Sequence, residues 1–219
     1  MKVAILLYDD FTALDAIGPY EVISRVPGWD LTFVARTAGP QQTDSGVTSV
    51  EARSSFVDCP EADIVLVPGG PGSRVVMKDE NTLDWLRRVA AGARWVTSVC
   101  TGSLVLAAAG LLDGKRCTTY WLYLEQLREL GAEPVAERVV IDGNIVTAAG
   151  VSSGIDMALT LVAEAVAPEL AQAIQLGIEY DPQPPFDSGS PKSASAETVE
   201  LVTGIAAQQD EWLSARRAE

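Results

Sequence analysis

The sequence predicts an α/β protein with a mostly parallel sheet, helices on both faces of that sheet and a cysteine at a strand-to-helix turn. Short apolar runs alternate along the chain with longer segments of helical periodicity, which is typical of a parallel sheet. Turns that contain glycine follow two of these runs, at residues 68–72 and 100–102. Ligands of such sheets bind at the carboxyl ends of the strands, so these turns are where we expect a site.

In the first half of the chain the predicted elements alternate regularly. Apolar runs predict strands at 2–8, 30–35, 63–67 and 95–99, and helical periodicity predicts helices at 14–26 and 81–91. The last of these strands runs from Trp95 to Val99, and the Leu/Ala stretch after Gly102 favours a packed helix. The turn between them resembles a nucleophile elbow that presents Cys100 beside a helix N-terminus, where free N–H groups and the helix dipole favour the thiolate.

The second half predicts a hairpin followed by helices. The runs 139–141 and 145–147 flank Asp142-Gly143-Asn144, where glycine supplies the positive φ of a tight hairpin turn. Helices are predicted at 153–165, 168–179 and 198–215, the last within a C-terminal helix at 195–217. The prolines of 181–193 predict a surface strap. We expect one domain over 1–219, with the last helix packed on its own domain or on a second subunit.

Composition narrows the partners and the compartment. A formal net charge of −14 and a pI near 4.4 oppose binding to nucleic acid and to anionic membranes. The N-terminal apolar run is too short for a signal peptide, and no run approaches a membrane span. Three cysteines, an odd number in dissimilar contexts, argue against a disulfide framework and for a cytoplasmic protein.

The absence of histidine limits the chemistry. With no histidine in the chain, a Cys-His dyad, a Ser-His-Asp triad and histidine-based metal sites are excluded. The cysteines lack paired spacing, so no metal site is expected. A proton acceptor or donor for Cys100 must therefore be an aspartate, glutamate, tyrosine, lysine or water.

Asp15 is the best candidate for that partner. It lies just past the carboxyl end of the first predicted strand, near the start of the first helix. The structural alternative is a carboxylate that interacts with the helix dipole, a stabilisation of about 0.3–1 kcal/mol. Asp9, Asp10 and Glu21 compete for the same role. Cys100 has a structural alternative too, a small hydrophobic side chain in a buried turn.

Gly69 and Gly70 form a turn that brings backbone close to a ligand. Without side chains, the N–H of Gly70 and the N–H of Thr101 are predicted to form an anion hole opposite Cys100. The structural alternative is an ordinary Pro-Gly-Gly turn. Neither the Gly-x-Gly-x-x-Gly fingerprint nor the Walker pattern is present, so nucleotides are set aside.

Motifs along nearly the whole chain resemble those of the ThiJ/PfpI superfamily. They are Leu14-Asp15-x-x-Gly18-Pro19, Val67-Pro-Gly-Gly70, Ser98-Val-Cys-Thr-Gly-Ser103, Ala107-Ala-Ala-Gly-Leu-Leu112, Thr118-Thr119-x-Trp121, Asp142-Gly-Asn144, Gly154-Ile-Asp156 and Glu179-Tyr-x-Pro-x-Pro-Pro-Phe186. The resemblance implies a flavodoxin-like three-layer sandwich and a homodimer. Within the superfamily the motifs are most similar to those of isocyanide hydratases, which add water to an organic isocyanide to give an N-substituted formamide.

The same resemblance implies roles for individual residues. Cys100 would be the nucleophile that forms a thioimidate, Asp15 its acidic partner and Thr101 a neighbouring hydroxyl, without a cofactor. The residues expected to contact the substrate are Gly69, Gly70, Tyr120, Trp121, Val151 and Ser152. Tyr120 stands where many relatives have histidine, and the side chains of 149–152 also depart from the hydratase pattern, so substrate preference is expected to differ more than mechanism.

Two other classes of function stay open at this point. One is another thiol-dependent activity of the superfamily, glyoxalase-like or amide-hydrolysing. The other is a non-catalytic redox or ligand sensor that uses the same thiol. Much of the pattern also occurs in the sensor domains of AraC-type regulators, but the acidic charge disfavours DNA regulation.

Overall fold

The computed structural model describes the backbone of residues 1–216 and the side chains of residues 1–208. Backbone contacts divide the chain into two compact units, Met1–Glu179 and Tyr180–Glu219. Each unit is described by itself. The single domain expected over 1–219 stays a prediction.

The first unit is built on a seven-stranded sheet with the strand order β10-β11-β7-β6-β1-β2-β5. Every neighbouring pair in it is parallel except the hairpin β10–β11 at one edge. The strands are β1 (Lys2–Leu6), β2 (Asp30–Ala35), β5 (Ser54–Ser55), β6 (Ile64–Val67), β7 (Trp95–Val99), β10 (Val139–Asp142) and β11 (Ile145–Ala148). Two smaller pairs are β3 (Gly39–Gln42) with β4 (Ser49–Ala52) and β8 (Arg116–Cys117) with β9 (Glu133–Pro134).

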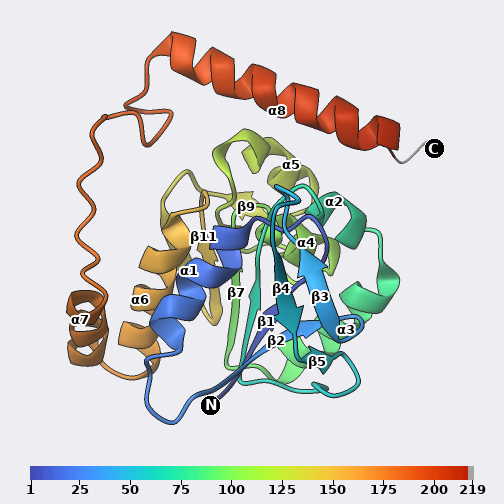
Figure 1. The fold of residues 1–219 in the computed structure, drawn as a ribbon, viewed down its shortest axis with the longest axis vertical. Coiled ribbons are helices and arrows are strands. Elements are labelled where there is room, and N and C mark those ends of the chain that lie inside the picture. Colours follow the sequence, from blue (N-terminus) through green and yellow to red (C-terminus); the bar gives the residue numbers. More distant parts are fainter. Residues whose placement is uncertain (217–219) are drawn as a thin grey trace. The chain divides into compact units, whose positions relative to one another are not determined.

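Helices cover both faces of this sheet (Figure 1). On one face lie α1 (Ala13–Ile23) and α6 (Ser153–Ala165), which pack on each other, with α7 (Pro168–Gly177) against α6. On the other lie α3 (Glu80–Gly92) and α4 (Gly102–Ala108). The remaining short helices are α2 (Ser73–Val76), α5 (Leu124–Glu129) and the 3₁₀ turn η1 (Trp121–Tyr123). The expected flavodoxin-like three-layer sandwich is confirmed.

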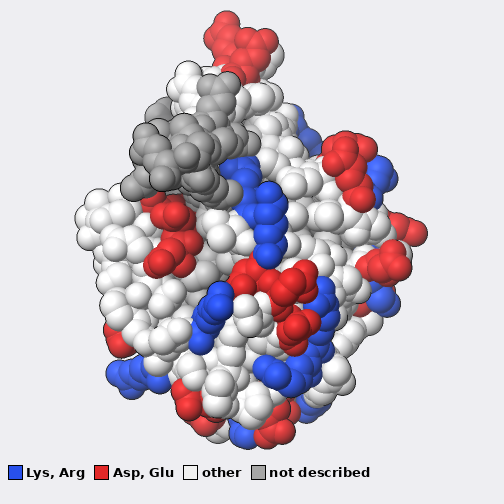
Figure 2. All heavy atoms as spheres, turned by 90° about the vertical axis from the view of Figure 1, so that its right-hand side faces the viewer, with Lys and Arg blue, Asp and Glu red and all other residues white. Residues whose placement is uncertain are grey.

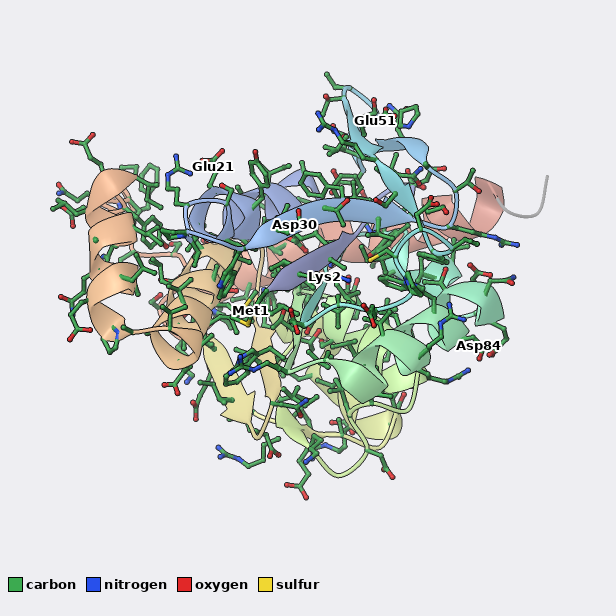
Figure 3. All side chains as sticks on the ribbon, turned by 90° about the horizontal axis from the view of Figure 1, so that it is seen from below. Met1, Lys2, Glu21, Asp30, Glu51 and Asp84 are labelled. Atoms are coloured by element: carbon green, nitrogen blue, oxygen red, sulfur yellow. The ribbon has the colours of Figure 1, made fainter. Side chains whose placement is uncertain are left out.

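The core explains why the central strands are so apolar. β6 is buried along its whole length, as expected for a parallel strand covered on both faces. Charged residues of this sheet are confined to the strand ends, where Lys2 and Asp30 are paired in register at the amino ends of β1 and β2 (Figure 3). Inside β7 and β11 the polar residues are the buried hydroxyl residues Thr97, Ser98 and Thr147. The carboxyl ends, at the opposite edge of the sheet, are left to build the site.

The predicted elements are present with small shifts at their ends. The first strand ends at Leu6, two residues early, and the first helix ends at Ile23, three residues early. The strand at 30–35, the strand at 95–99 and the helix at 153–165 have the predicted bounds. Gly143 has a φ of 62° in the predicted hairpin turn. Strands β3 and β4 were not predicted, because β3 (Gly-Pro-Gln-Gln) has no apolar alternation and β4 (Ser-Val-Glu-Ala) alternates over only four residues.

The second unit begins with an extended, proline-rich segment. Residues 181–193 contain no helix or strand, as the prolines predict. They lead into α8 (Ala196–Arg216), which begins one residue after the predicted start at 195. Residue 217, the predicted end, lies outside the described residues. Within the described part of the chain, no helix is both long and apolar enough to cross a membrane.

Acidic and basic side chains lie interspersed on the face of the molecule drawn in Figure 2. Ion pairs also mix the two charges along single elements: on α3, Arg87 pairs with Asp84 (2.7 Å) and Glu80 (3.1 Å). A nucleic-acid surface requires a continuous basic patch, which this face does not carry.

Candidate active site

The carboxyl ends of three neighbouring strands bring the predicted site residues together. β1, β6 and β7 are adjacent in the sheet, and the chain order reverses direction between β1 and β6, which is where α/β sheets bind their ligands. Asp15 comes from the first turn of α1, after β1; Gly69 follows β6; Cys100 follows β7. The site therefore sits at the switch point of the sheet.

Cys100 occupies a strained backbone position. Its φ is 56°, in the left-handed region that costs a non-glycine residue about 1–3 kcal/mol. Its N–H donates to the carbonyls of Ala148 (3.1 Å) and Ala149 (2.8 Å), and its carbonyl accepts from the hydroxyls of Ser103 (3.1 Å) and Thr119 (3.0 Å). These four bonds hold the strained conformation, and the side chain stays 6% exposed. The predicted elbow is confirmed.

The sequence around the elbow leaves room for this close packing. A Cβ on Gly102 would lie 2.1 Å from the carbonyl oxygen of Val67, so only glycine lets α4 start this close to β6. The helix that follows buries Leu104, Val105 and Leu106. The predicted change from strand to packed helix is therefore what fixes the thiol in place.

Asp15 is completely buried beside this thiol. Its Oδ2 accepts the N–H of Gly69 at 2.9 Å, whereas its Oδ1 has no hydrogen-bond partner of normal geometry. Burial raises the pKa of Asp15 to about 7, although the Gly69 N–H and the Cys100 thiol lower it; the charge of Asp44 raises it further. A carboxyl group with a pKa near neutrality is suited to both accepting and donating a proton.

The pKa of Cys100 is shifted in the opposite direction from the one predicted. Burial, followed by the negative charge of Asp15, raises the pKa of the Cys100 thiol well above its ordinary value. The N–H and hydroxyl of Thr101 lower it, as the position beside a helix N-terminus predicts, but they do not outweigh the burial. Above about pH 7 the pair of Asp15 and Cys100 therefore holds one proton between two groups.

The predicted anion hole is wrong in one of its two donors. The N–H of Gly70 donates to Thr101 Oγ1 at 3.0 Å, so it is not directed at a ligand. Thr101 Oγ1 also accepts from Ser73 Oγ at 3.1 Å. Gly70 thus orients the Thr101 hydroxyl, and the Thr101 N–H is the donor that stays next to the sulfur.

Gly69 fills the space between the catalytic candidates. A Cβ there would lie 2.5 Å from Thr101 N and 2.9 Å from Asp15 Oδ2. We expect Gly69→Ala to lower the free energy of unfolding by about 1–3 kcal/mol through overpacking, and to displace Asp15. Urea unfolding measures this, with Gly92→Ala as the matched control because a Cβ on Gly92 meets nothing within 4 Å. Equal stability of the two variants would contradict the close approach.

Tyr120 borders the site beside Thr119. Its ring is partly buried, and a Cβ on Gly150 would lie 3.3 Å from its Cδ2. Ring centroids of Trp121 and Tyr123 lie 5.9 and 6.1 Å from that of Tyr120. Burial raises the pKa of Tyr120, so its phenol stays protonated near neutral pH. Trp121 joins the aromatic group that borders the site.

The two predicted residues of the following loop lie at its edge. Val151 is partly buried, whereas Ser152 is exposed and its hydroxyl accepts from Arg138 at 3.3 Å. The loop itself reaches the elbow through the carbonyl of Ala149, which accepts the Cys100 N–H. Contact of either side chain with a substrate stays a prediction.

The competing acids are engaged elsewhere. Asp9 Oδ1 accepts the N–H of Gln42 at 2.9 Å, and Glu21 pairs with Arg25 at 2.7 Å on the exposed side of α1. Asp10 adopts a φ of 62° in the turn before α1. Asp15 is therefore the one of the four acids that the structure buries beside Cys100.

Sequence reasoning missed two polar side chains at the site, Tyr8 and Ser73. The buried Tyr8 hydroxyl donates to the Pro68 carbonyl at 2.5 Å and braces the turn before Gly69. Ser73, only 2% exposed, contacts Thr101. Tyr8 lies at the end of the first predicted strand and Ser73 directly follows the 68–72 turn. Their position beside these two predicted segments is the signal that could have found them.

Among the described residues, no three His, Cys, Asp or Glu side chains gather to hold a metal.

Comparisons with known proteins show the family and the fold of the chain. The DJ-1/PfpI family model matches residues 1–164. An isonitrile hydratase of Pseudomonas putida is 48% identical over 200 residues, covering 91% of this chain and 87% of that protein. The transcriptional regulator GbdR of Pseudomonas aeruginosa is 31% identical over 188 residues, but the match spans 51% of its length. The crystal structure of a ThiJ/PfpI family protein from Pseudomonas syringae superimposes with a TM-score of 0.92 at 35% identity, over 98% of this chain and 89% of that one.

Proposed function

The chain belongs to the DJ-1/PfpI family, and we propose that it is an isocyanide hydratase that converts an organic isocyanide into an N-substituted formamide. The observation that carries the proposal is the buried pair of Cys100 and Asp15, a thiol and a carboxyl group with no histidine beside them. The 48% identity to the isonitrile hydratase of Pseudomonas putida supports it.

The first step joins the thiol to the isocyanide. Cys100 passes its proton to Asp15, and the sulfur bonds to the terminal carbon of the isocyanide. The proton then moves from Asp15 to that same carbon, which gives the neutral thioimidate R–N=CH–S–Cys100. No group leaves, so the adduct contains the whole isocyanide. Thr101, through its N–H and hydroxyl, stabilises the sulfur while it is charged.

The second step adds water to the thioimidate. Asp15 is ionised after the first step, and its unpartnered Oδ1 is the atom available to accept a proton from water. The water oxygen bonds to the carbon, and Asp15 delivers the proton to nitrogen, which gives R–NH–CH(OH)–S–Cys100. The C–S bond then breaks, the hydroxyl proton returns to the sulfur through Asp15, and the formamide R–NH–CHO is released.

The alternatives fit the geometry less well. Amide hydrolysis develops an oxyanion that enzymes bind with preorganised donors, commonly two backbone N–H groups, and here the Gly70 N–H is already engaged by Thr101. Addition to an isocyanide forms no oxyanion in its first step. A redox sensor requires an easily oxidised thiolate, whereas burial raises the pKa of Cys100 and keeps the thiol protonated.

The test is direct. The protein is incubated with one aryl and one alkyl isocyanide, and the formamide is followed by chromatography against an authentic standard. We expect formamide to accumulate well above the rate without protein. Absence of formamide from both substrates, together with turnover of methylglyoxal or a small amide, would replace the hydratase by one of the other thiol-dependent activities.

Tyr120 is expected to affect substrate affinity more than chemistry. Because its ring packs at the border of the site while Asp15 and Cys100 hold the reacting proton, Tyr120→Ala should raise KM for an aryl isocyanide about tenfold with kcat within about threefold. Tyr120→Phe should retain most of that affinity. Steady-state kinetics measure both, with Tyr20→Phe on α1 as the control. A large fall in kcat for Tyr120→Phe would instead assign the phenol a part in proton transfer.

Two further proposals concern the oligomeric state of the protein and the compartment in which it works. We propose a homodimer, supported by the family resemblance, and light scattering coupled to gel filtration tests it. The free state of Cys59, Cys100 and Cys117 supports a reducing compartment such as the cytoplasm.

A further inference from the structure

Ser73 is a buried polar residue that the mechanism above does not use. It is the first residue of α2, 2% exposed, and directly follows the glycine turn. Its N–H donates to the Gly70 carbonyl at 3.0 Å, and its hydroxyl donates to Thr101 Oγ1 at 3.1 Å. Ser73 is therefore held by the same turn that holds Thr101.

The hydrogen bond from Ser73 limits the directions in which the Thr101 hydroxyl can point its own hydrogen. A threonine hydroxyl has two acceptor positions and one hydrogen. The N–H of Gly70 and the hydroxyl of Ser73 fill both acceptor positions. The single hydrogen of Thr101 must then point to an acceptor of its own.

Two acceptors lie within reach of that hydrogen. One is the Gly70 carbonyl, which accepts this hydrogen in the structure, at 3.3 Å from Thr101 Oγ1, a long distance for an O–H···O bond. The other is the sulfur of the adjacent Cys100 once it is ionised, because the Thr101 hydroxyl lowers the pKa of that thiol. An ionised sulfur is the stronger acceptor of the two.

We propose that Ser73 is a positioning residue that directs the Thr101 hydroxyl hydrogen to the Cys100 sulfur and thereby stabilises the thiolate. Without Ser73, one acceptor position on Thr101 Oγ1 is vacant, and the protonated thiol can donate to it. The same hydroxyl then stabilises the thiol instead of the thiolate. The inference rests on the proposed function only in its link to turnover, because the thiolate forms with or without an isocyanide.

Other groups also act on the sulfur, and Ser73 variants leave them in place. Asp15 on α1 raises the pKa of Cys100, and the Cys100 charge in turn raises the pKa values of Tyr8 after β1 and Tyr120 before η1. No positive charge contributes to the shifted pKa of Cys100, so hydrogen bonds to Thr101 are what opposes the burial. A change in one such bond should therefore be measurable.

The experiment is the pH dependence of Cys100 alkylation by iodoacetamide, read from the mass of the peptide that contains Cys100 so that Cys59 and Cys117 do not contribute. At pH 8, Ser73→Ala is expected to react about tenfold more slowly than wild type, with its profile shifted to higher pH. Ser73→Thr, which keeps the hydroxyl, should restore most of the rate. In the isocyanide assay the same variants should change kcat/KM in the same order.

Ser98→Ala is the matched control. Ser98 is also a buried serine, two residues before Cys100, but its hydroxyl has no hydrogen-bond partner. Its alkylation profile should superimpose on that of wild type. An unshifted profile for Ser73→Ala would overturn the proposal, and so would an equal shift for Ser98→Ala or a failure of Ser73→Thr to restore the rate. A protein inactive on isocyanides would still give these profiles, so failure of the hydratase proposal is separately visible.

Discussion

Cys100→Ala is expected to lower formamide formation from an aryl isocyanide by at least about 10⁴-fold, the scale seen when a nucleophile is removed from a catalytic group of this kind. The thiol forms the covalent bond to carbon, and no neighbouring side chain in the site can replace it. Asp15 alone would have to direct water at a free isocyanide, without the thioimidate that makes the carbon electrophilic. Initial rates measure the loss, with circular dichroism to confirm the fold.

Two further variants test whether the loss of activity is specific to the Cys100 thiol: Cys100→Ser and the control Cys117→Ala. Serine keeps the size and the strained turn, but a buried hydroxyl is much harder to ionise than a thiol, so it should be nearly as inactive as alanine. Cys117 is buried on β8, where burial raises its pKa to about 11, and it lies outside the site. Cys117→Ala should retain wild-type turnover. Activity surviving in Cys100→Ala would leave the hydratase but remove the covalent mechanism.

Asp15→Asn is expected to lower kcat/KM by about 10²–10⁴-fold, the usual contribution of general acid–base catalysis. The amide oxygen can still accept the Gly69 N–H, but the group can no longer take a proton from the thiol or from water. In wild type, kcat/KM should rise with pH through about 7 as Asp15 ionises, because below that pH both groups are protonated and no base remains. The variant should lose this rise.

The same substitution is expected to stabilise the protein at alkaline pH. The pKa of Asp15 is raised from 3.8 in the unfolded chain to about 7 in the fold, so the folded state holds this proton more tightly. Stability is therefore full below about pH 4 and falls as the pH rises through about 7, with a total on the order of 4 kcal/mol. Asparagine does not ionise, so Asp15→Asn should not show this fall in stability with rising pH.

Urea unfolding at pH 5 and pH 8 measures the effect. Asp15→Asn should gain stability over wild type mainly at pH 8, whereas Glu21→Gln, at an exposed ion pair on the same helix, should show no such pH dependence. A pH-independent difference between Asp15→Asn and wild type would contradict the raised pKa. A gain at pH 8 would show that the carboxylate is kept for chemistry at a cost in stability.

The elbow and its acidic partner could be predicted from the sequence for specific reasons. Cys100 lies where a strand pattern changes to a helical one, and the absence of histidine leaves an acid near a strand end as its partner. The central strands were predicted because burial on both faces makes them continuously apolar. Each of these features could be predicted because it depends on residues that are close together in the sequence.

What could not be predicted depends on distances between distant segments. The direction of the Cys100 pKa follows from how deeply the folded chain buries the thiol, and the dipole argument alone gives the opposite sign. The Gly70 N–H is turned away from a ligand by a hydroxyl 31 residues further along the chain. Ser73 gains its role only through Thr101, and no motif marks such a contact.

The most direct test of the account is the mass of the protein during turnover. Wild type and Asp15→Asn are mixed with excess isocyanide, quenched within milliseconds to seconds and analysed as intact protein and as peptides. We expect wild type to carry a species heavier by the full mass of the isocyanide, located on Cys100, and Asp15→Asn to form that species more slowly because asparagine cannot take the thiol proton. Formamide production with Cys100 unmodified at every time point, or an adduct lighter than the whole isocyanide, would contradict the covalent hydration mechanism.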